Sequence, residues 1–487
     1  MTKTAAIIGG GVIGGGWAAR FLLNGWDVRL SDPDPEAARK IDEILENARR
    51  SLPGLADVAM PDEGRLTFCA SIAEAVAGAE WVQESVPEQL DLKRRIFADI
   101  QKTARSDAVI ASSTSGFKPS DLQAGATFPG QILVCHPFNP VYLLPLVEVV
   151  PGGDTGTRIF QKALDILTDL GMKPLPVRKE IDAHIADRLL EAVWRESLWL
   201  VNDGIATTKE IDDAICFGFG LRWAQMGLFE TYRIAGGEAG MTHFLAQFGP
   251  ALAWPWTKLM NVPELTDTLI ERIARQSDEQ SGTHSIRELE RIRDNNLVAI
   301  MRGLKHQNWG VGKLLKTHDT ALYPLAAETI DFSKPIRTLS RAIPLNWTDY
   351  NGHMNEARYL QAFSKATDRF MEIVGCDADY IAGGGSYFTA ETHIRHIDEV
   401  NAGMRVYVET LCLSGEGKKM HLFNTLYLED GRLLATGEHL LIHIDLKERR
   451  SSLPSPDVAR KLAMIAEHHA KLPRPDGIGR YVGEHRP

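Results

Sequence analysis

The sequence predicts three kinds of domain in succession: an α/β domain with a parallel sheet, an all-α domain and an α+β domain. Short apolar runs first alternate with helical stretches, which is the pattern of βαβ units. Helical periodicity without β-branched clusters follows, and the last third has one amphipathic helix before several alternating runs. The expected boundaries are 1–183, 184–320, 336–450 for these domains, with a linker over 321–335 and a tail over 451–487.

Composition limits the kind of protein that this can be. The chain has 54 basic and 64 acidic residues, and the net charge of −10 gives no reason to expect nucleic acid as a partner. Five cysteines are scattered without a CxxC pair, which predicts reduced thiols and no metal site. No apolar run reaches the ~18 residues of a membrane span, and no signal peptide is recognised. We therefore expect a cytoplasmic protein that does not bind membranes.

The first domain begins with an apolar run over residues 4–9, which meets a group of glycines and then a helical pattern from Trp17 to Leu23. Asn24 and Gly25 end that helix, and residues 27–31 form the next strand-like run. Helical stretches separate the further strand-like runs, which lie at 80–85, 108–112 and 132–136. Strands that alternate with helices in this way indicate a parallel sheet.

The glycines after the first run form the pattern GxGxxG over residues 9–14, GGGVIG. Gly9 permits a tight turn, Gly11 lets a pyrophosphate approach the backbone, and Gly14 lets helix and strand pack closely. Val12 and Ile13 open the helix, whose free N–H groups face the phosphates. A glycine-rich turn alone can be purely structural. This one follows a strand and opens a helix, which favours dinucleotide binding.

An acidic residue, Asp32, ends the second strand-like run, where a ribose-binding carboxylate is expected. Such a carboxylate accepts hydrogen bonds from both ribose hydroxyls and repels a 2′-phosphate. The next residues are Pro33, Asp34 and Pro35, so no basic residue follows immediately. The pattern predicts a Rossmann domain that binds NAD in preference to NADP.

Three further motifs resemble the 3-hydroxyacyl-CoA dehydrogenase family in order and spacing. They are QESVPE at 83–88, SSTSG at 112–116 and HPFNP at 136–140, with LVE following at 146–148. The resemblance extends from residue 1 to about 315. It implies a Rossmann domain, a helical domain that usually forms a homodimer, and an active site between the two.

The same resemblance implies roles for individual residues. His136 is the general base, Glu148 orients it, and Ser115 hydrogen-bonds the substrate oxygen and the histidine. Imidazole suits this chemistry because it titrates near neutral pH, and a carboxylate on its second nitrogen fixes the tautomer. On spacing alone, His136 and Glu148 could equally be a structural ion pair. Position in the family also assigns Glu88 and Lys93 to the cofactor and Asn139 to the substrate.

Three positions depart from that family's usual pattern. Ser113 replaces an asparagine, Pro137 replaces a phenylalanine, and Asp187 replaces the asparagine that precedes Arg-Leu-Leu. The last change puts an acyl-CoA substrate in doubt. The segments HIADRLLEAVWRESLWLVNDG, GLRWAQMG and HFLAQFGPAL resemble more closely the L-carnitine 3-dehydrogenases, a branch of the family. That resemblance implies oxidation of L-carnitine to 3-dehydrocarnitine with NAD, and it assigns Asp187 to the substrate site.

Carnitine carries a quaternary ammonium, and aromatic faces bind such cations. Aromatic residues gather in the helical domain at Trp194, Trp199, Trp223, Tyr232, Trp254 and Trp256. Helix packing or a dimer interface is the better explanation for any single tryptophan, but the cluster can supply a wall of a cation site. Of these we assign Trp223 to the substrate, and Arg222 or Arg195 to its carboxylate.

In the third domain, DYNGHMN at 349–355 is followed by a helical pattern over 356–374 and strand-like runs at 337–345, 406–411, 421–428 and 433–444. The motif resembles the 4-hydroxybenzoyl-CoA thioesterases, which have a hotdog fold. The resemblance implies that Asp349 either attacks the thioester carbonyl or activates water. The backbone N–H groups that begin the helix would polarise the carbonyl. His353 and Asn355 are expected to brace the loop. The tail is helical over 455–471 and has no assigned role.

The two resemblances together predict a bifunctional enzyme. In the implied route, 3-dehydrocarnitine reacts with acetyl-CoA to give betainyl-CoA, so we expect the second site to hydrolyse that acyl-CoA to glycine betaine. One alternative is a 3-hydroxyacyl-CoA dehydrogenase fused to a general acyl-CoA thioesterase. Another is a non-catalytic, crystallin-like NAD-binding protein whose hotdog serves only for dimerisation.

Overall fold

The structure is a computed structural model of the whole chain, and it describes residues 3–235, 244–246, 257, 264, 266–281, 283–322, 330–349 and 351–480. Contacts divide the chain into two units. The first consists of Met1–Ala48 and Asp62–His318, and the second of Arg49–Pro61 and Asp319–Pro487. Each unit thus draws on two stretches of chain. Among the described helices, none has both the length and the apolar character needed to cross a bilayer.

The first unit contains an eight-stranded sheet in the order β3-β2-β1-β4-β5-β6-β7-β8. The strands are β1 (Thr4–Ile8), β2 (Asp27–Ser31), β3 (Leu66–Phe68), β4 (Trp81–Glu84), β5 (Val109–Ser112), β6 (Ile132–Pro137), β7 (Leu146–Pro151) and β8 (Lys173–Pro176). Every neighbouring pair is parallel except β6 and β7. The short connection between β6 and β7 explains this exception, because a parallel partner needs a crossover of a dozen or more residues.

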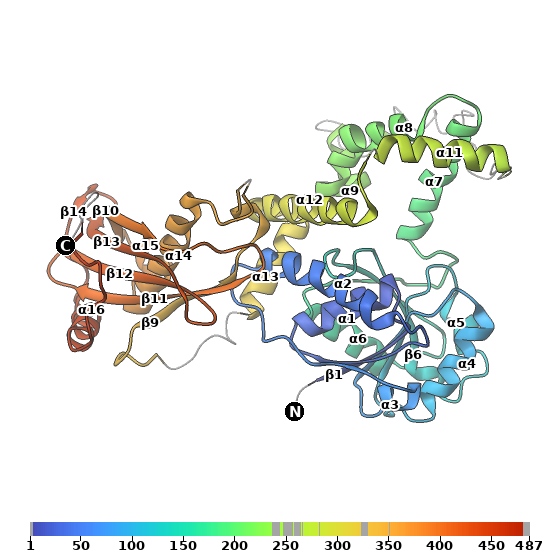
Figure 1. Cartoon of the computed structure of the whole chain (residues 1–487), viewed down its shortest axis with the longest axis horizontal. Coiled ribbons are helices and arrows are strands. Elements are labelled where there is room, and N and C mark those ends of the chain that lie inside the picture. The colour runs from blue at the N-terminus through green and yellow to red at the C-terminus, as the bar shows by residue number, and fades with distance from the viewer. Residues whose placement is uncertain are drawn as a thin grey trace. The chain divides into compact units, whose positions relative to one another are not determined.

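Helices flank this sheet (Figure 1). They are α1 (Val12–Leu23), α2 (Ala37–Ser51), α3 (Ile72–Val76), α4 (Leu90–Gln101), α5 (Pro119–Gln123) and α6 (Thr157–Asp169). Residues of β4 and β5 are buried at every position, as expected when helices cover both faces of a sheet. Ile8, Val82, Ile110 and Val134 from adjacent strands pack into one core cluster. This core holds the carboxyl ends of the strands in place.

The rest of the first unit is helical, as the sequence predicts. Its helices are α7 (Ala186–Asn202), α8 (Thr208–Ala214), α9 (Gly220–Ala235), α11 (Asp267–Ser281), α12 (Ile286–Gln307) and α13 (Val311–Leu322). A short π-helix, Ile215–Phe219, joins α8 to α9. Large apolar side chains on these elements are exposed, among them Leu189 at 61%, Phe217 at 79% and Phe229 at 74%. The last helix continues to Leu322, so residues 321 and 322 of the expected linker are helical.

The second unit is an antiparallel sheet in the order β10-β13-β12-β11-β9, with β14 beside β13. Its elements are β9 (Ile336–Ala342), α14 (Glu356–Val374), α15 (Ala378–Ala382), β10 (Gly385–His396), β11 (Arg405–Ser414), β12 (Lys419–Leu428), β13 (Leu433–Asp445), β14 (Arg450–Ser451) and α16 (Pro456–His469). The sequence does not reveal β10. Four consecutive exposed residues in the middle of that edge strand remove the alternation that marks a half-buried strand.

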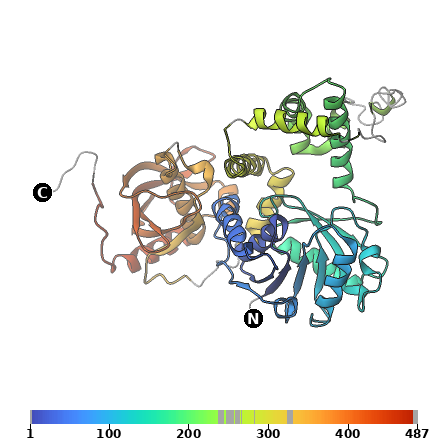
Figure 2. The ribbon, with the colours of Figure 1, turned by 45° about the vertical axis from the view of Figure 1, so that its right-hand side comes forward.

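Helix α14 packs against the curled sheet (Figure 2). Its Phe363 and Ala366 lie in one core cluster with Val408 and Leu426 from the strands. The Asn355 side chain caps the start of the helix, and Gly375, with φ of 93°, ends it. Helix α16 accounts for the helical part of the tail, because its buried residues join a second cluster with Phe370 and Cys412.

A short segment from early in the chain completes the second unit. The Arg341 guanidinium donates to the carboxylate of Asp57 at 3.3 Å and to the carbonyl of Ala56 at 3.1 Å. It also lies 4.4 Å from the centre of the Trp347 ring. Because Arg341 is only 2% exposed, these acceptors satisfy a charge that water cannot reach. A Cβ added to Gly54 would lie 3.1 Å from Pro344, so segment 49–61 fits closely.

Candidate active sites

The glycine-rich turn lies between β1 and α1, as the sequence predicts. Gly9 has φ of 97°, and a Cβ there would lie 2.7 Å from the Ser85 carbonyl oxygen. A Cβ on Gly14 would collide with the carbonyl oxygen of Gly9. A Cβ on Gly11 would meet nothing within 4 Å, so the space beside that residue is open. The turn therefore needs glycine at its first and third positions and leaves room at the second.

The start of α1 and the end of β2 fit a dinucleotide. Gly11 is the N-cap of α1 and provides no side-chain hydrogen bond, which leaves helix N–H groups available to a phosphate. The Asp32 carboxylate accepts from the Gly10 amide and from the Asp34 amide at 2.7 Å. These bonds fix the carboxylate beside the turn, where the ribose hydroxyls are expected.

His136 and Glu148 lie directly opposite each other on the antiparallel strands β6 and β7. His136 Nδ1 is 3.0 Å from Glu148 Oε2. The carboxylate is fully buried and the imidazole is 7% exposed. Opposed residues on one face of an antiparallel pair have side chains close enough to bond. The fold therefore sets the histidine tautomer, with Nδ1 donating and Nε2 directed away from the glutamate.

The second oxygen of Glu148 is also engaged. Glu148 Oε1 accepts from the backbone amides of Ile185 at 2.7 Å and Ala186 at 2.8 Å, where α7 begins. Burial by itself raises the pKa of Glu148, but the hydrogen bonds from His136, Ala186 and Ile185 outweigh it and lower the pKa below the usual value. The glutamate is thus held as a carboxylate against both the imidazole and the start of the helical domain.

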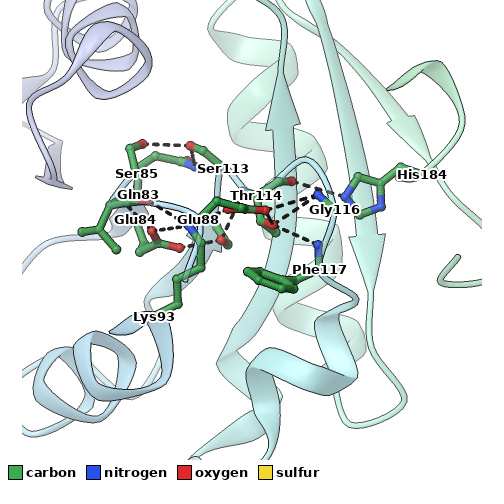
Figure 3. Close-up of polar contacts among 12 residues, drawn as sticks. Gln83, Glu84, Ser85, Glu88, Lys93, Ser113, Thr114, Gly116, Phe117 and His184 are labelled. Atoms are coloured by element: carbon green, nitrogen blue, oxygen red, sulfur yellow. Dashed lines mark hydrogen bonds and ion pairs between the residues drawn. The ribbon is translucent and has the colours of Figure 1, made fainter. Parts of the chain in front are cut away.

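A second histidine lies beside this pair. The ring of His184 is fully buried, and its centroid is 5.6 Å from that of His136. His184 Nε2 donates to the Thr114 carbonyl oxygen at 3.3 Å (Figure 3). Burial lowers the pKa of His184, so this imidazole is neutral near pH 7. Ala183 and His184 have φ of 59° and 48°, a left-handed conformation that the hydrogen bond helps to hold.

A polar network extends from Thr114 into the sheet (Figure 3). Thr114 Oγ1 donates to Glu88 and accepts from the Phe117 amide at 3.0 Å. The Lys93 ammonium lies 3.2 Å from Glu88 Oε2 and 2.8 Å from Glu84 Oε1. Since Lys93 is only 1% exposed, its ammonium serves to pair these carboxylates, which in turn hold the loop that carries Ser115.

The remaining residues that were predicted to contact the substrate differ in their burial and in their contacts with the catalytic pair. Asp187 is half-buried on the first turn of α7, within electrostatic reach of His136. Ser115 is half-buried and Asn139 is exposed. Trp223 packs on Phe219, with ring centroids 4.5 Å apart, and no described contact joins it or Arg222 to His136. Trp254 and Trp256 lie outside the described residues.

Two residues that the sequence analysis did not single out adjoin His136. They are His184 and Phe138, whose ring centroid is 5.0 Å from that of His136. Phe138 belongs to the HPFNP motif, two residues after His136, so the sequence could have indicated that it lies near the histidine. His184 is the first residue of the segment HIADRLL, which also carries a resemblance, but its closeness to His136 depends on two successive left-handed residues between β8 and α7 that the sequence does not indicate.

The candidate thioesterase site is a loop before α14. The Asp349 amide donates to the His353 carbonyl at 3.0 Å, and the Asn351 amide donates to Asp349 Oδ1 at 2.8 Å. His353 Nδ1 lies 3.2 Å from Glu399 Oε2. Asn355 caps the helix by accepting from the Ala357 amide at 3.1 Å. The half-buried Asp349 therefore belongs to a hydrogen-bonded loop that leads into the N-terminus of α14.

Family models match both units. Residues 4–181 match the NAD binding domain of 3-hydroxyacyl-CoA dehydrogenase and residues 184–269 match its C-terminal domain. Residues 343–462 match the thioesterase-like superfamily. The Rossmann, helical and hotdog folds predicted from the sequence are confirmed, and so is NAD as the cofactor.

Proteins similar along their whole length carry both domains. A relative from Ruegeria pomeroyi, named L-carnitine dehydrogenase/betainyl-CoA thioesterase, is 66% identical over 98% of each chain. One of the same name from Agrobacterium fabrum is 56% identical over 97% of each. A solved 5-formyl-3-hydroxy-2-methylpyridine 4-carboxylic acid 5-dehydrogenase, described as an NAD⁺-dependent dismutase, is 27% identical with a TM-score of 0.54, over 63% of this chain and 99% of its own. The chain therefore belongs to the family of L-carnitine dehydrogenase/betainyl-CoA thioesterases.

Proposed function

We propose that the chain oxidises L-carnitine to 3-dehydrocarnitine with NAD and hydrolyses betainyl-CoA to glycine betaine and CoA at a separate site. The observation that carries the first activity is the buried His136–Glu148 pair, which leaves one imidazole nitrogen available to a substrate hydroxyl. The second activity is supported by Asp349, which lies on the loop that leads into α14. The names of the full-length relatives supply the substrates.

In the dehydrogenase, NAD supplies the acceptor for the hydride that leaves the substrate's carbinol carbon. His136 Nε2 takes the proton of the hydroxyl, because Nδ1 already donates to Glu148. Glu148 stabilises the resulting imidazolium and is itself held by the amides of Ile185 and Ala186. Ser115 hydrogen-bonds the substrate oxygen. Gly9, Gly11, Gly14, Asp32 and the amides at the start of α1 bind the dinucleotide.

In the thioesterase, Asp349 either attacks the thioester carbonyl or removes a proton from the water that does so. If Asp349 attacks, the C–S bond breaks to give the CoA thiol and a mixed anhydride, which water then hydrolyses to release glycine betaine and restore the carboxylate. If water attacks, the C–S bond breaks directly to give glycine betaine and the CoA thiol. The first N–H groups of α14 favour the negative charge that develops on the carbonyl oxygen. Gly352, with φ of 82°, keeps the loop backbone free of a side chain beside Asp349.

We also propose that the chain is a cytoplasmic homodimer. Exposed apolar side chains are concentrated on α7, on the short π-helix Ile215–Phe219 and on α9, namely Leu189, Leu190, Trp194, Phe217, Leu221, Phe229 and Ile234. Exposed apolar side chains in this number on neighbouring helical segments favour burial against a second copy. Light scattering at micromolar concentration tests this, and a monomeric mass there contradicts it.

A substrate comparison tests the proposed function. NADH formation is measured with L-carnitine and with 3-hydroxybutyryl-CoA, and CoA release with betainyl-CoA and with acetyl-CoA. We expect L-carnitine to be oxidised and betainyl-CoA to be preferred in hydrolysis. If only the CoA ester is oxidised, the carnitine assignment is wrong. If acetyl-CoA and betainyl-CoA are hydrolysed equally well, the second site is a general acyl-CoA thioesterase.

A further inference from the structure

We propose that Asp187 binds the trimethylammonium group of the dehydrogenase substrate and selects for a cationic substituent next to the reacting carbon. The inference rests on the proposed oxidation of carnitine. It differs from the expectation that aromatic rings on the helices supply the cation site, because it assigns the main electrostatic interaction to a carboxylate beside His136.

The structure of the substrate restricts where its counter-charge can lie. In carnitine a single methylene separates the quaternary nitrogen from the carbinol carbon. When His136 Nε2 contacts the hydroxyl, the ammonium must therefore lie within a few ångströms of the imidazole. A group that stabilises the ammonium has to belong to the immediate surroundings of His136, and Trp223, which packs on Phe219, has no described contact there.

Asp187 lies next to two residues that contact the catalytic pair. The two residues before it, Ile185 and Ala186, donate their amides to Glu148 Oε1, so the start of α7 is fixed to the catalytic pair. Asp187 follows on the first turn of that helix, and the charges acting on it include those of His136, Glu148 and His184. Its carboxylate is thus close enough to respond to the protonation of the general base.

The other nearby carboxylates are already engaged. Glu148 accepts three hydrogen bonds and is fully buried. Glu191, one turn further along α7, pairs with Arg195 at 3.4 Å. No ion pair joins the Asp187 carboxylate to a lysine or arginine among the described residues. Of the carboxylates described around His136, Asp187 is therefore the one available to a substrate cation.

Burial supports this assignment. Burial raises the pKa of Asp187, because a half-buried carboxylate without a cation is less stable than one in water. A quaternary ammonium would offset that penalty. It has no N–H to donate, so the interaction is purely electrostatic and needs proximity and not a directed hydrogen bond.

The test compares two substrates in the full-length Asp187→Asn variant. One is L-carnitine, and the other is its tert-butyl isostere, in which carbon replaces the quaternary nitrogen. We expect the KM for carnitine to rise about 10- to 100-fold with kcat changed by less than about 3-fold. The kcat/KM for the isostere should stay constant or increase. An equal loss with both substrates, or no loss with carnitine, overturns the proposal.

Binding without turnover separates this inference from the proposed reaction. The deoxy analogue of carnitine keeps both charges but has no hydroxyl, and its dissociation constant is measured by calorimetry in the presence of NADH. Asp187→Asn should weaken that binding about 10- to 100-fold, whereas Glu191→Gln, the matched control one turn away, should change it by less than about 3-fold. Equal weakening in both variants contradicts a specific role for Asp187. If wild-type enzyme binds the analogue yet oxidises no carnitine, the proposed reaction fails while this inference stands.

Discussion

The two candidate catalytic centres hold their carboxylates in different ways. Glu148 lies on β7, inside the sheet and fully buried, and each of its oxygens has a protein donor. Asp349 lies on a loop, half-buried, and accepts from the Asn351 amide of the same loop. A carboxylate that orients a base works best when it is held in one position and shielded from water. A carboxylate that acts on a substrate must remain accessible. The difference predicts that changes at the two centres have separable effects.

The largest expected effect is that of His136→Ala on dehydrogenation. Loss of the general base should lower kcat for NADH formation about 10²- to 10⁴-fold. Betainyl-CoA hydrolysis, measured on the same preparation, should stay within about 2-fold of wild type. His136→Asn, which leaves a smaller cavity, should show the same pattern. If both activities are lost in both variants, the two centres are not independent.

Asp349→Asn should have the reverse effect. Hydrolysis of betainyl-CoA, followed by thiol release, should fall about 10²- to 10³-fold because the amide neither attacks the carbonyl nor accepts a proton from water. NADH formation should be unaffected. The control is Asp398→Asn, which removes a carboxylate paired with Arg432 in the same unit. Comparable loss of hydrolysis in the control would show that the unit is sensitive to any such change.

Glu148→Gln should have a smaller effect on dehydrogenation, about 10- to 100-fold on kcat. The amide keeps the shape but removes the charge that stabilises protonated His136. In wild type, the pKa of Glu148 is lowered, so its stabilising contribution is present above the unfolded-state pKa of about 4.3 and is lost as the pH falls through the folded value. The variant should therefore lose stability less steeply in acid, as measured by urea unfolding of the first unit. An unchanged kcat would show that Glu148 is only structural.

The smallest expected effect concerns His439 in the thioesterase unit. Burial lowers the pKa of this histidine to about 4. The folded value is below the unfolded value of about 6.5, so stability is full above pH 6.5 and falls as the pH decreases toward 4. Between pH 8 and pH 5, the free energy of unfolding of His439→Gln should fall by about 2 kcal/mol less than that of wild type. Urea midpoints at pH 8 and pH 5 check this, and an identical pH dependence in the variant contradicts it.

Local patterns predicted much of the fold. The glycine turn appears as expected because its φ angle and close approaches exclude other residues, and α14 has the predicted bounds because Asn355 and Gly375 cap its ends. Strand β10 was missed because its exposed middle lacks periodicity. The antiparallel β6–β7 pair places His136 opposite Glu148. The spacing of the two residues in the sequence could not by itself distinguish a catalytic pair from a structural ion pair. The position of His184 could not be predicted, since it depends on left-handed backbone at two successive residues.

The interruption of the first unit by residues 49–61 has a consequence for how the two activities can be separated. Cleavage of the chain at the junction between residues 318 and 319 would leave the hydrolase without the segment that accepts hydrogen bonds from Arg341. In a hydrolase expressed without residues 49–61, the Arg341 guanidinium would lose these acceptors. This guanidinium contacts Trp347, two positions before Asp349. The hydrolase unit is therefore built from two separate stretches of the chain, and a single cut between residues 318 and 319 cannot release it whole.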